Sequence, residues 1–114
     1  MDQKKLMFRI KNKTDQEKLT ISSMMYFVAD TAVFTVTDMI RQKCSLMMAW
    51  LEEDALKMKV LYEPSAAVTI GKMLNKSDKG IHIVMLSDGA LVILSMKDPK
   101  GVAPQVVKQQ AKFS

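Results

Sequence analysis

Few residues in this sequence are of the types that carry enzyme chemistry. His82 is the only histidine and Cys44 is the only cysteine. His82 stands inside an apolar run, where a hydrogen-bonded structural role is more typical than catalysis. A single cysteine excludes an intrachain disulfide and also the common zinc sites, which need several Cys and His ligands. We therefore expect no metal and no other cofactor.

Three carboxylates are adjacent in the sequence, at Glu52, Glu53 and Asp54. If this stretch is helical, successive side chains diverge by about 100 degrees, so the carboxylates do not converge on one ligand. The four glycines are too dispersed to form a phosphate-binding loop or a dinucleotide fingerprint. The sequence therefore predicts that the protein is not an enzyme, and no small-molecule substrate is evident.

The strongest candidate site is a lysine-bearing stretch that begins at Ser65. If Ser65 caps a helix, Thr69, Lys72 and Lys76 lie at i, i+3 and i+7 on its outer face. Short polar and cationic side chains on such a face contact base edges and phosphates in DNA-binding proteins. Lys79, in the loop that follows, would add a contact to the DNA backbone.

The order of elements around these lysines resembles a winged helix. A predicted helix, a short loop and a hairpin follow one another as a recognition helix and a wing do, and SAAVTIGKMLNKSDKG is similar to the second helix of a helix-turn-helix. Two features depart from that pattern. Glu63-Pro64 replaces the usual glycine turn, and the hairpin is apolar on both faces. The resemblance implies duplex DNA as the partner and transcription regulation as the function.

The hairpin itself is the most clearly specified element of the chain. Apolar runs over residues 81–86 and 91–96 flank Asp88-Gly89, which favours positive φ at both central positions of a type I′ turn. A two-residue turn places Leu86 opposite Leu91. Because both faces are then apolar, we expect both to be covered, either by the protein or by a partner.

The remaining periodicities predict an α+β fold. Residues 5–11 alternate as a strand, and residues 16–30, 37–55 and 65–75 show helical spacing. Residues 31–37 fit a short strand or a loop, and residues 56–62 fit a strand better than a helix. The expected architecture is a small mixed sheet that includes the Asp88-Gly89 hairpin, with three to four helices, in a winged-helix-like arrangement.

Length and composition indicate a soluble globular protein. We expect one domain over residues 1–98, followed by a basic C-terminal tail or short helix at 99–114. The N-terminus does not read as a signal peptide, and the apolar segment 19–40 carries Asp30 near its middle, which disfavours membrane insertion. The lone Cys44 favours a reducing compartment, so we expect a cytoplasmic location.

Two functions are compatible with these features. The formal net charge is +5, and basic residues are concentrated at both ends of the chain, which favours a small DNA-binding transcription regulator. The alternative is a non-catalytic protein-interaction module that dimerises or binds a partner through an apolar surface rich in methionine, of which the chain has 11. Met47, Met48 and Met85 are candidates for that surface. We expect a homodimer.

Overall fold

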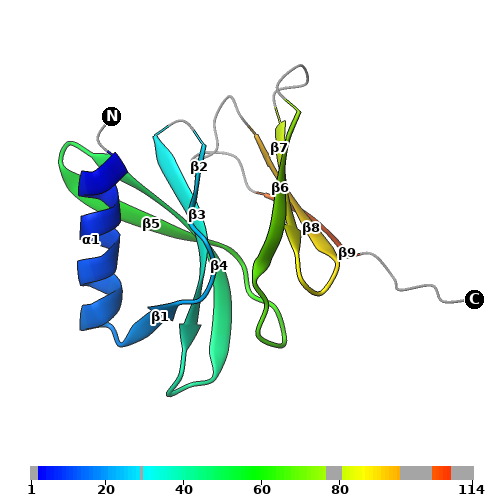
Figure 1. Cartoon of the computed structure of the whole chain (residues 1–114), viewed down its shortest axis with the longest axis horizontal. Coiled ribbons are helices and arrows are strands. Elements are labelled where there is room, and N and C mark those ends of the chain that lie inside the picture. The colour runs from blue at the N-terminus through cyan, green and yellow to red at the C-terminus, as the bar shows by residue number, and fades with distance from the viewer. Residues whose placement is uncertain (1–2, 29, 77–80, 96–103, 109–114) are drawn as a thin grey trace, which may run out of the picture. The chain divides into compact units, whose positions relative to one another are not determined.

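A computed structural model of the protein describes residues 3–28, 30–76, 81–95 and 104–108. Over these residues the chain forms one α-helix and nine β-strands, which make two antiparallel sheets (Figure 1). The expected fold with three to four helices is therefore wrong, and so is the winged-helix interpretation. The backbone clusters into two compact units, Met1–Ala67 and Val68–Ser114. The division into residues 1–98 and 99–114 stays a prediction.

The N-terminal unit consists of a helix and a five-stranded sheet. The sheet order is β1-β3-β4-β5, and β2 pairs with the same side of β3 as β1 does. β5 therefore forms one edge of this sheet. The elements are α1 (Gln3–Gln16), β1 (Leu19–Ile21), β2 (Tyr26–Val28), β3 (Thr31–Asp38), β4 (Lys43–Glu52) and β5 (Ala55–Tyr62).

The N-terminal segment is helical although its apolar residues alternate as in a strand. Leu6, Ile10 and Thr14 recur at a spacing of four residues, and all three are buried. Phe8 completes the apparent alternation, but it is 63% exposed on the outside of the helix. The strand expected over residues 5–11 is therefore wrong. Two of its three apolar positions also satisfy the helical period.

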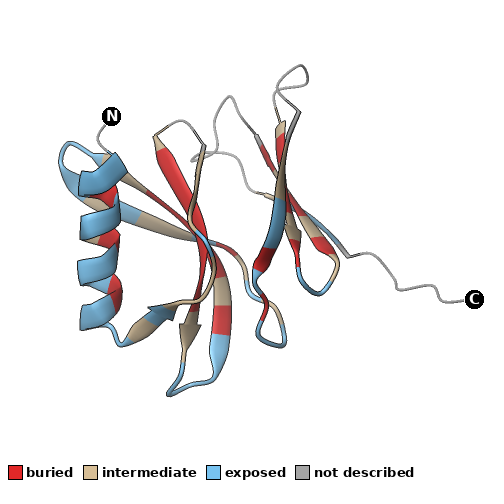
Figure 2. Ribbon diagram, viewed as in Figure 1, coloured by how far each residue is buried: buried red, intermediate tan, exposed pale blue. Residues whose placement is uncertain are grey.

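The core of the N-terminal unit forms where α1 covers one face of the sheet (Figure 2). The register pairs Ala32 with Ala49 and Phe34 with Met47, so these residues share that face. The buried residues of this cluster are Leu6, Ile10, Ala32, Phe34, Val36, Met47 and Ala49.

The helix expected over residues 37–55 is instead a hairpin of strands. β3 and β4 are buried on both faces. In β4, Leu46 and Met48 on one face are 0% exposed, and Met47 and Ala49 on the other are 9% and 0% exposed. A strand buried on both faces is continuously apolar, and such a run cannot be told from a buried helix by periodicity. The Asp38 carboxylate accepts hydrogen bonds from the backbone N–H groups of Ile40 and Arg41, at 3.0 and 3.1 Å, in the β3–β4 loop.

The helix expected over residues 16–30 is also wrong, because α1 ends at Gln16 and two short strands follow. Ser22 and Ser23 fill the gap between β1 and β2. The Thr35 backbone N–H donates to Ser23 Oγ at 2.9 Å, and the Ser22 backbone N–H donates to the Thr35 carbonyl at 2.8 Å. These bonds replace the ladder where the strand is interrupted.

Within the described part of the chain, no helix has the length and apolar character needed to cross a membrane.

The C-terminal unit is a four-stranded antiparallel sheet in the order β6-β7-β8-β9. Its strands are β6 (Ile70–Lys76), β7 (Ile81–Leu86), β8 (Ala90–Ser95) and β9 (Gln105–Lys108). The helix expected over residues 65–75 is a strand from Ile70 onward. β-branched residues precede Gly71, which is unfavourable in a helix interior, and pairing with β7 satisfies the backbone. Of the short strand and the loop that residues 31–37 allowed, the structure has a strand, β3, and the strand expected over 56–62 is confirmed as β5.

The central hairpin is confirmed, but its register differs by one residue. Met85, and not Leu86, lies opposite Leu91. The Gly89 N–H donates to the Leu86 carbonyl at 2.9 Å, and Gly89 has a φ of 89°. This pattern is typical of a three-residue loop in which a left-handed glycine follows a type I turn. The expected two-residue type I′ turn is therefore wrong.

Candidate functional site

Of the four residues predicted to contact DNA, the three that the structure describes do not lie on a helix. Thr69 directly precedes β6, Lys72 lies within it and Lys76 is its last residue, while Lys79 lies outside the described residues. Thr69 and Lys72 are exposed. The register pairs Lys72 with Met85 and Lys76 with Ile81, and a register shift between Ile70 and Lys72 brings Thr69 into the same alternation, so the three positions share one side of a strand and not one side of a helix. DNA contact by these residues stays a prediction, but the helical face on which it rested is absent from this segment.

Thr69 instead holds the loop of the β7–β8 hairpin. Its backbone N–H donates to Ser87 Oγ at 3.0 Å, and the Ser87 backbone N–H donates to the Thr69 carbonyl at 2.9 Å. This reciprocal pair extends the β6–β7 ladder by one position. Thr69 therefore positions the hairpin through its backbone.

The C-terminal sheet has one buried face and one partly exposed apolar face. Residues paired across an antiparallel ladder share a face, and the register pairs Leu74 with Ile83 and Ile83 with Ile93. The neighbouring residues Val84 and Val92 point the other way and have 0% exposure. We call the partly exposed side the outer face. It carries Leu74, Ile81, Ile83, Met85, Leu91 and Ile93, with Lys72, Gln105 and Val107 on the two edge strands.

The two other methionines expected at an interaction surface are core residues. Met47 is 9% exposed and belongs to the core cluster of the N-terminal unit, and Met48 is 0% exposed. Of the three candidates, only Met85 lies on a partly exposed face. The apolar surface that the structure shows is therefore built mainly from isoleucine and leucine.

His82 lies on the buried face of the C-terminal sheet, opposite Leu94 and not opposite Ser95. Only 6% of its surface is exposed, and its Nδ1 atom has no hydrogen-bond partner among the described residues. Burial lowers the pKa of His82, which favours the neutral imidazole. The hydrogen-bonded role expected for His82 is therefore not seen at Nδ1, and the side chain packs on the buried face of the sheet.

Cys44 and the adjacent carboxylates Glu52, Glu53 and Asp54 lie at positions with a structural role. Cys44 is buried in β4, opposite Thr37. Glu53 and Asp54 form the two-residue β4–β5 turn, with φ values of 50° and 67°. Over residues 3–28, 30–76, 81–95 and 104–108, no three His, Cys, Asp or Glu side chains gather in a way that could hold a metal ion.

A groove of about 460 Å³ runs between α1 and β5 at the edge of the N-terminal sheet. Arg9, Asn12, Lys13 and Gln16 line it from α1, where their spacing of i, i+3, i+4 and i+7 places them along one flank of the helix. Leu56 and Met58 line it from β5. We call this cavity the edge groove. Its walls carry hydrogen-bonding and cationic groups above an apolar floor, an arrangement suited to binding.

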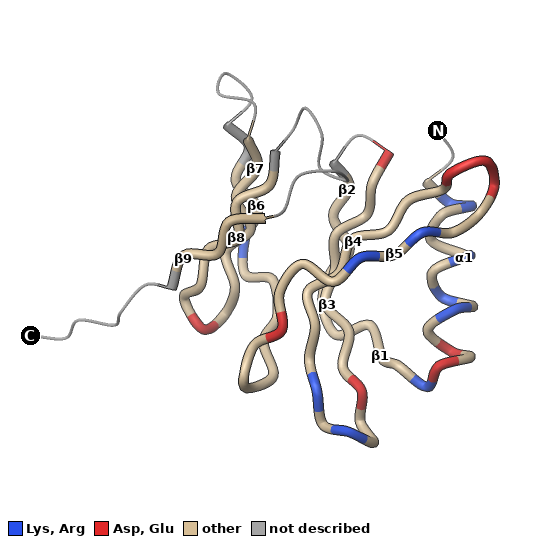
Figure 3. Tube along the Cα trace, turned by 180° about the vertical axis from the view of Figure 1, so that it is seen from behind, with Lys and Arg blue, Asp and Glu red and all other residues tan. Residues whose placement is uncertain are grey.

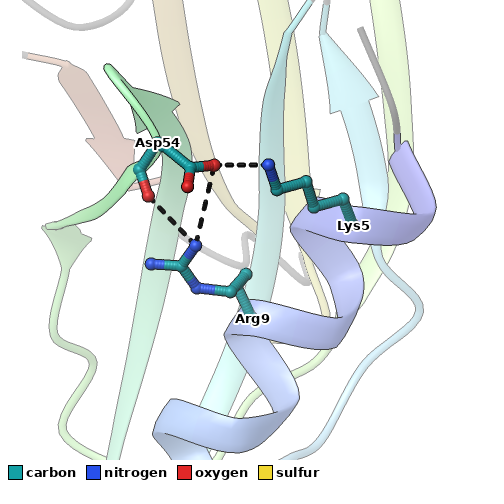
Figure 4. Close-up of polar contacts among 3 residues, drawn as sticks. All are labelled: Lys5, Arg9 and Asp54. Carbon is teal, nitrogen blue, oxygen red and sulfur yellow. Dashed lines mark hydrogen bonds and ion pairs between the residues drawn. The ribbon is translucent and has the colours of Figure 1, made fainter.

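Ion pairs fix one end of the edge groove (Figure 4). The Lys5 ammonium pairs with the Asp54 carboxylate, and Arg9 Nη1 donates to the Asp54 backbone carbonyl at 3.0 Å. The hydrogen bond and the charge of Lys5 lower the pKa of Asp54. These contacts join the N-terminal half of α1 to the β4–β5 turn, and so hold the helix beside the start of β5.

The edge groove was not found from the sequence because residues 5–11 were expected to form a strand. The signal that could have revealed it is the spacing of Leu6, Ile10 and Thr14, which defines the buried side of α1. Once that side is known, Arg9 and Lys13 fall on an adjacent flank.

The chain has no recognisable relative in the comparisons with known proteins. No family model, no curated protein and no solved structure matches it.

Proposed function

We propose that this protein is a non-catalytic protein-interaction module that forms a homodimer through the outer face of its C-terminal sheet. The observation that carries the proposal is the outer face itself, on which six apolar side chains from three adjacent strands are partly exposed. A contiguous exposed apolar patch on a protein surface is typical of an interaction site.

The outer face is large enough to form the centre of a dimer interface. Strands about 4.8 Å apart with a rise of about 3.4 Å per residue give a four-stranded face of about 15 by 20 Å, or about 300 Å². A standard interface buries roughly 800 Å² per partner, so residues around the face must also be buried in the dimer. Two such faces stack about 10 Å apart in sheet-on-sheet packing.

The distribution of residues over the outer face favours a second copy as the occupant. Its apolar centre lies on β7 and β8, the two inner strands, whereas Lys72 and Gln105 lie on the outer strands β6 and β9. A two-fold axis through the centre brings the apolar residues of both copies together and leaves the polar residues at the rim. An isologous interface requires this kind of self-complementarity.

The test is the mass of the protein in solution, measured by sedimentation equilibrium for the wild type and for Ile83→Asp. A carboxylate at the centre of the face must be desolvated on association, so we expect the dimer dissociation constant to rise at least a hundredfold. Ile40→Asp is the matched control, because Ile40 is 75% exposed in the β3–β4 loop. A monomeric wild type at about 100 µM would refute the proposal, because a dimer with a dissociation constant in the micromolar range would still be associated at that concentration.

Duplex DNA binding and a cytoplasmic location stay predictions from the sequence. The net charge of +5 still permits a polyanionic partner. The recognition helix that gave the DNA hypothesis its geometry is, however, the strand β6.

A further inference from the structure

We infer that the edge groove binds an extended, acidic segment of another protein, which adds to the N-terminal sheet as a strand beside β5. The inference is independent of the proposed dimer, because the edge groove belongs to the N-terminal sheet and the outer face belongs to the C-terminal sheet.

The backbone of β5 offers hydrogen-bonding groups at the sheet edge. Among the described strands, only β4 pairs with β5. The turn at Glu53-Asp54 makes Glu52 and Ala55 the closing pair of the hairpin, and hydrogen-bonded pairs then alternate with non-bonded pairs along the ladder. Leu56 and Met58 fall in non-bonded pairs. Their N–H and C=O groups are therefore directed to the open edge, where an added strand would find them.

Helix α1 supplies the second wall of this site. Its flank lies over the same two residues, because Arg9, Asn12, Lys13 and Gln16 line the groove together with Leu56 and Met58. A strand that fits between a helix and a sheet edge gains main-chain hydrogen bonds from the edge and side-chain contacts from the helix. Strand addition is a general mode of peptide recognition.

The charges around the groove favour an acidic partner. Arg9 and Lys13 stand on the helix side, where they also pair with Asp54 and Glu17. Lys57 and Lys59 alternate with the groove-lining residues of β5, so they lie on the opposite face of the sheet. Figure 3 shows basic positions along both α1 and β5. An added strand would therefore meet cations on both of its faces. Two copies of β5 pairing with each other would bring lysines together, and lysines on an edge strand are known to disfavour such pairing.

The alternation along β5 also predicts the pattern of the ligand. Ligand residues opposite Leu56 and Met58 face an apolar floor, whereas residues opposite Lys57 and Lys59 face ammonium groups. The best ligand thus alternates apolar and acidic residues. Cross-strand pairs of opposite charge stabilise a sheet, and like charges destabilise it.

The first experiment measures fluorescence polarization of a labelled seven-residue peptide that alternates Val and Glu, titrated with the full-length protein. We expect saturable binding that is at least tenfold weaker for the peptide with Lys in place of Glu. Equal binding of the two peptides, or no binding of the Glu peptide, would refute the inference.

Main-chain pairing is tested with two N-methylated forms of the Glu peptide. One carries N-methyl groups on the Val residues and the other on the Glu residues. Only one alternate set of N–H groups faces β5, so one peptide should lose binding and the other should retain it. Equal behaviour of the two N-methylated peptides would show that no strand is added.

The position of the site is tested with Lys57→Glu, which should weaken binding of the Glu peptide at least fivefold. Lys11→Glu is the control, because this exposed lysine on α1 does not line the groove and the change in net charge is the same. Circular dichroism spectra of both variants serve to check that each one folds. An equal loss in the two variants would indicate attraction by net charge alone and would contradict the proposed site. Ile83→Asp should leave peptide binding unchanged, which separates this inference from the proposed dimer.

Discussion

Asp54 makes two contacts with α1 at one end of the edge groove. Its carboxylate pairs with Lys5, and its backbone carbonyl accepts a hydrogen bond from Arg9. Its pKa is lowered by Lys5, so its carboxylate stabilises the folded state above the ordinary carboxyl pKa of 3.8, and this stabilisation is lost as the pH falls through the lower folded-state pKa. Asp54→Asn removes the charge but keeps a residue that tolerates positive φ.

We therefore expect Asp54→Asn to lower the urea midpoint slightly at pH 7, and the difference from the wild type to close as the pH falls below 3.8. The check is urea unfolding of both proteins at pH 7, 5 and 3. A difference that stays constant or widens on acidification would contradict the assigned ion pair.

His82 also makes the fold less stable in acid, but the cause is burial and not an ion pair. Burial lowers its pKa below 6.5, so the unfolded chain binds a proton more readily than the folded chain, and acid destabilises the fold from pH 6.5 downward. His82→Leu keeps an apolar side chain beside Leu94 and removes the titration.

The expected result is that the wild type loses stability relative to His82→Leu between pH 7 and 5, as measured by the difference in their free energies of unfolding. A difference that is independent of pH over this range would mean that His82 is accessible to protons in the folded state.

The β4–β5 turn stores strain that its sequence does not relieve. Glu53 and Asp54 both have positive φ, a conformation that costs most residues other than glycine about 1–2 kcal/mol. Asn is the preferred residue at the first central position of a type I′ turn.

Glu53→Asn should therefore raise the free energy of unfolding by about 0.5–1 kcal/mol, measured by urea denaturation at pH 7. Glu53→Ala serves as the comparison, since it removes the same carboxylate without favouring positive φ. If both variants change stability equally, the gain comes from charge and not from the turn.

Sequence patterns identified some elements and not others, for physical reasons. The Asp88-Gly89 hairpin was predictable because glycine marks the loop, but the register depended on whether the loop has two or three residues. β4 was not predictable, because its Leu, Met and Ala residues favour helices and tertiary burial on both faces overrides that preference. α1 was missed because Leu6 and Ile10 satisfy both periods.

The candidate sites show the same limit. The apolar outer face follows from the two-faced hairpin and was anticipated as a surface that needs covering. The edge groove joins α1 to β5, which are about forty residues apart in the chain, and a helix mistaken for a strand could not reveal it.

At the scale of the whole molecule, the described residues form one helix and two antiparallel sheets in two compact units, each with its own proposed binding surface. The C-terminal unit offers an apolar face for a second copy. The N-terminal unit offers a cationic edge for an extended acidic segment. Such a protein would bring a partner strand to a dimeric scaffold.

The most direct test of the dimer places a cysteine at the centre of the outer face. Ile83→Cys, treated with a short bis-maleimide reagent, should give a covalent dimer on a denaturing gel at low protein concentration, because position 83 lies near the proposed two-fold axis. Ile40→Cys replaces the same residue type at a more exposed position, and it should give only the monomer band on the gel. Cross-linking at position 40 but not at position 83 would contradict the account.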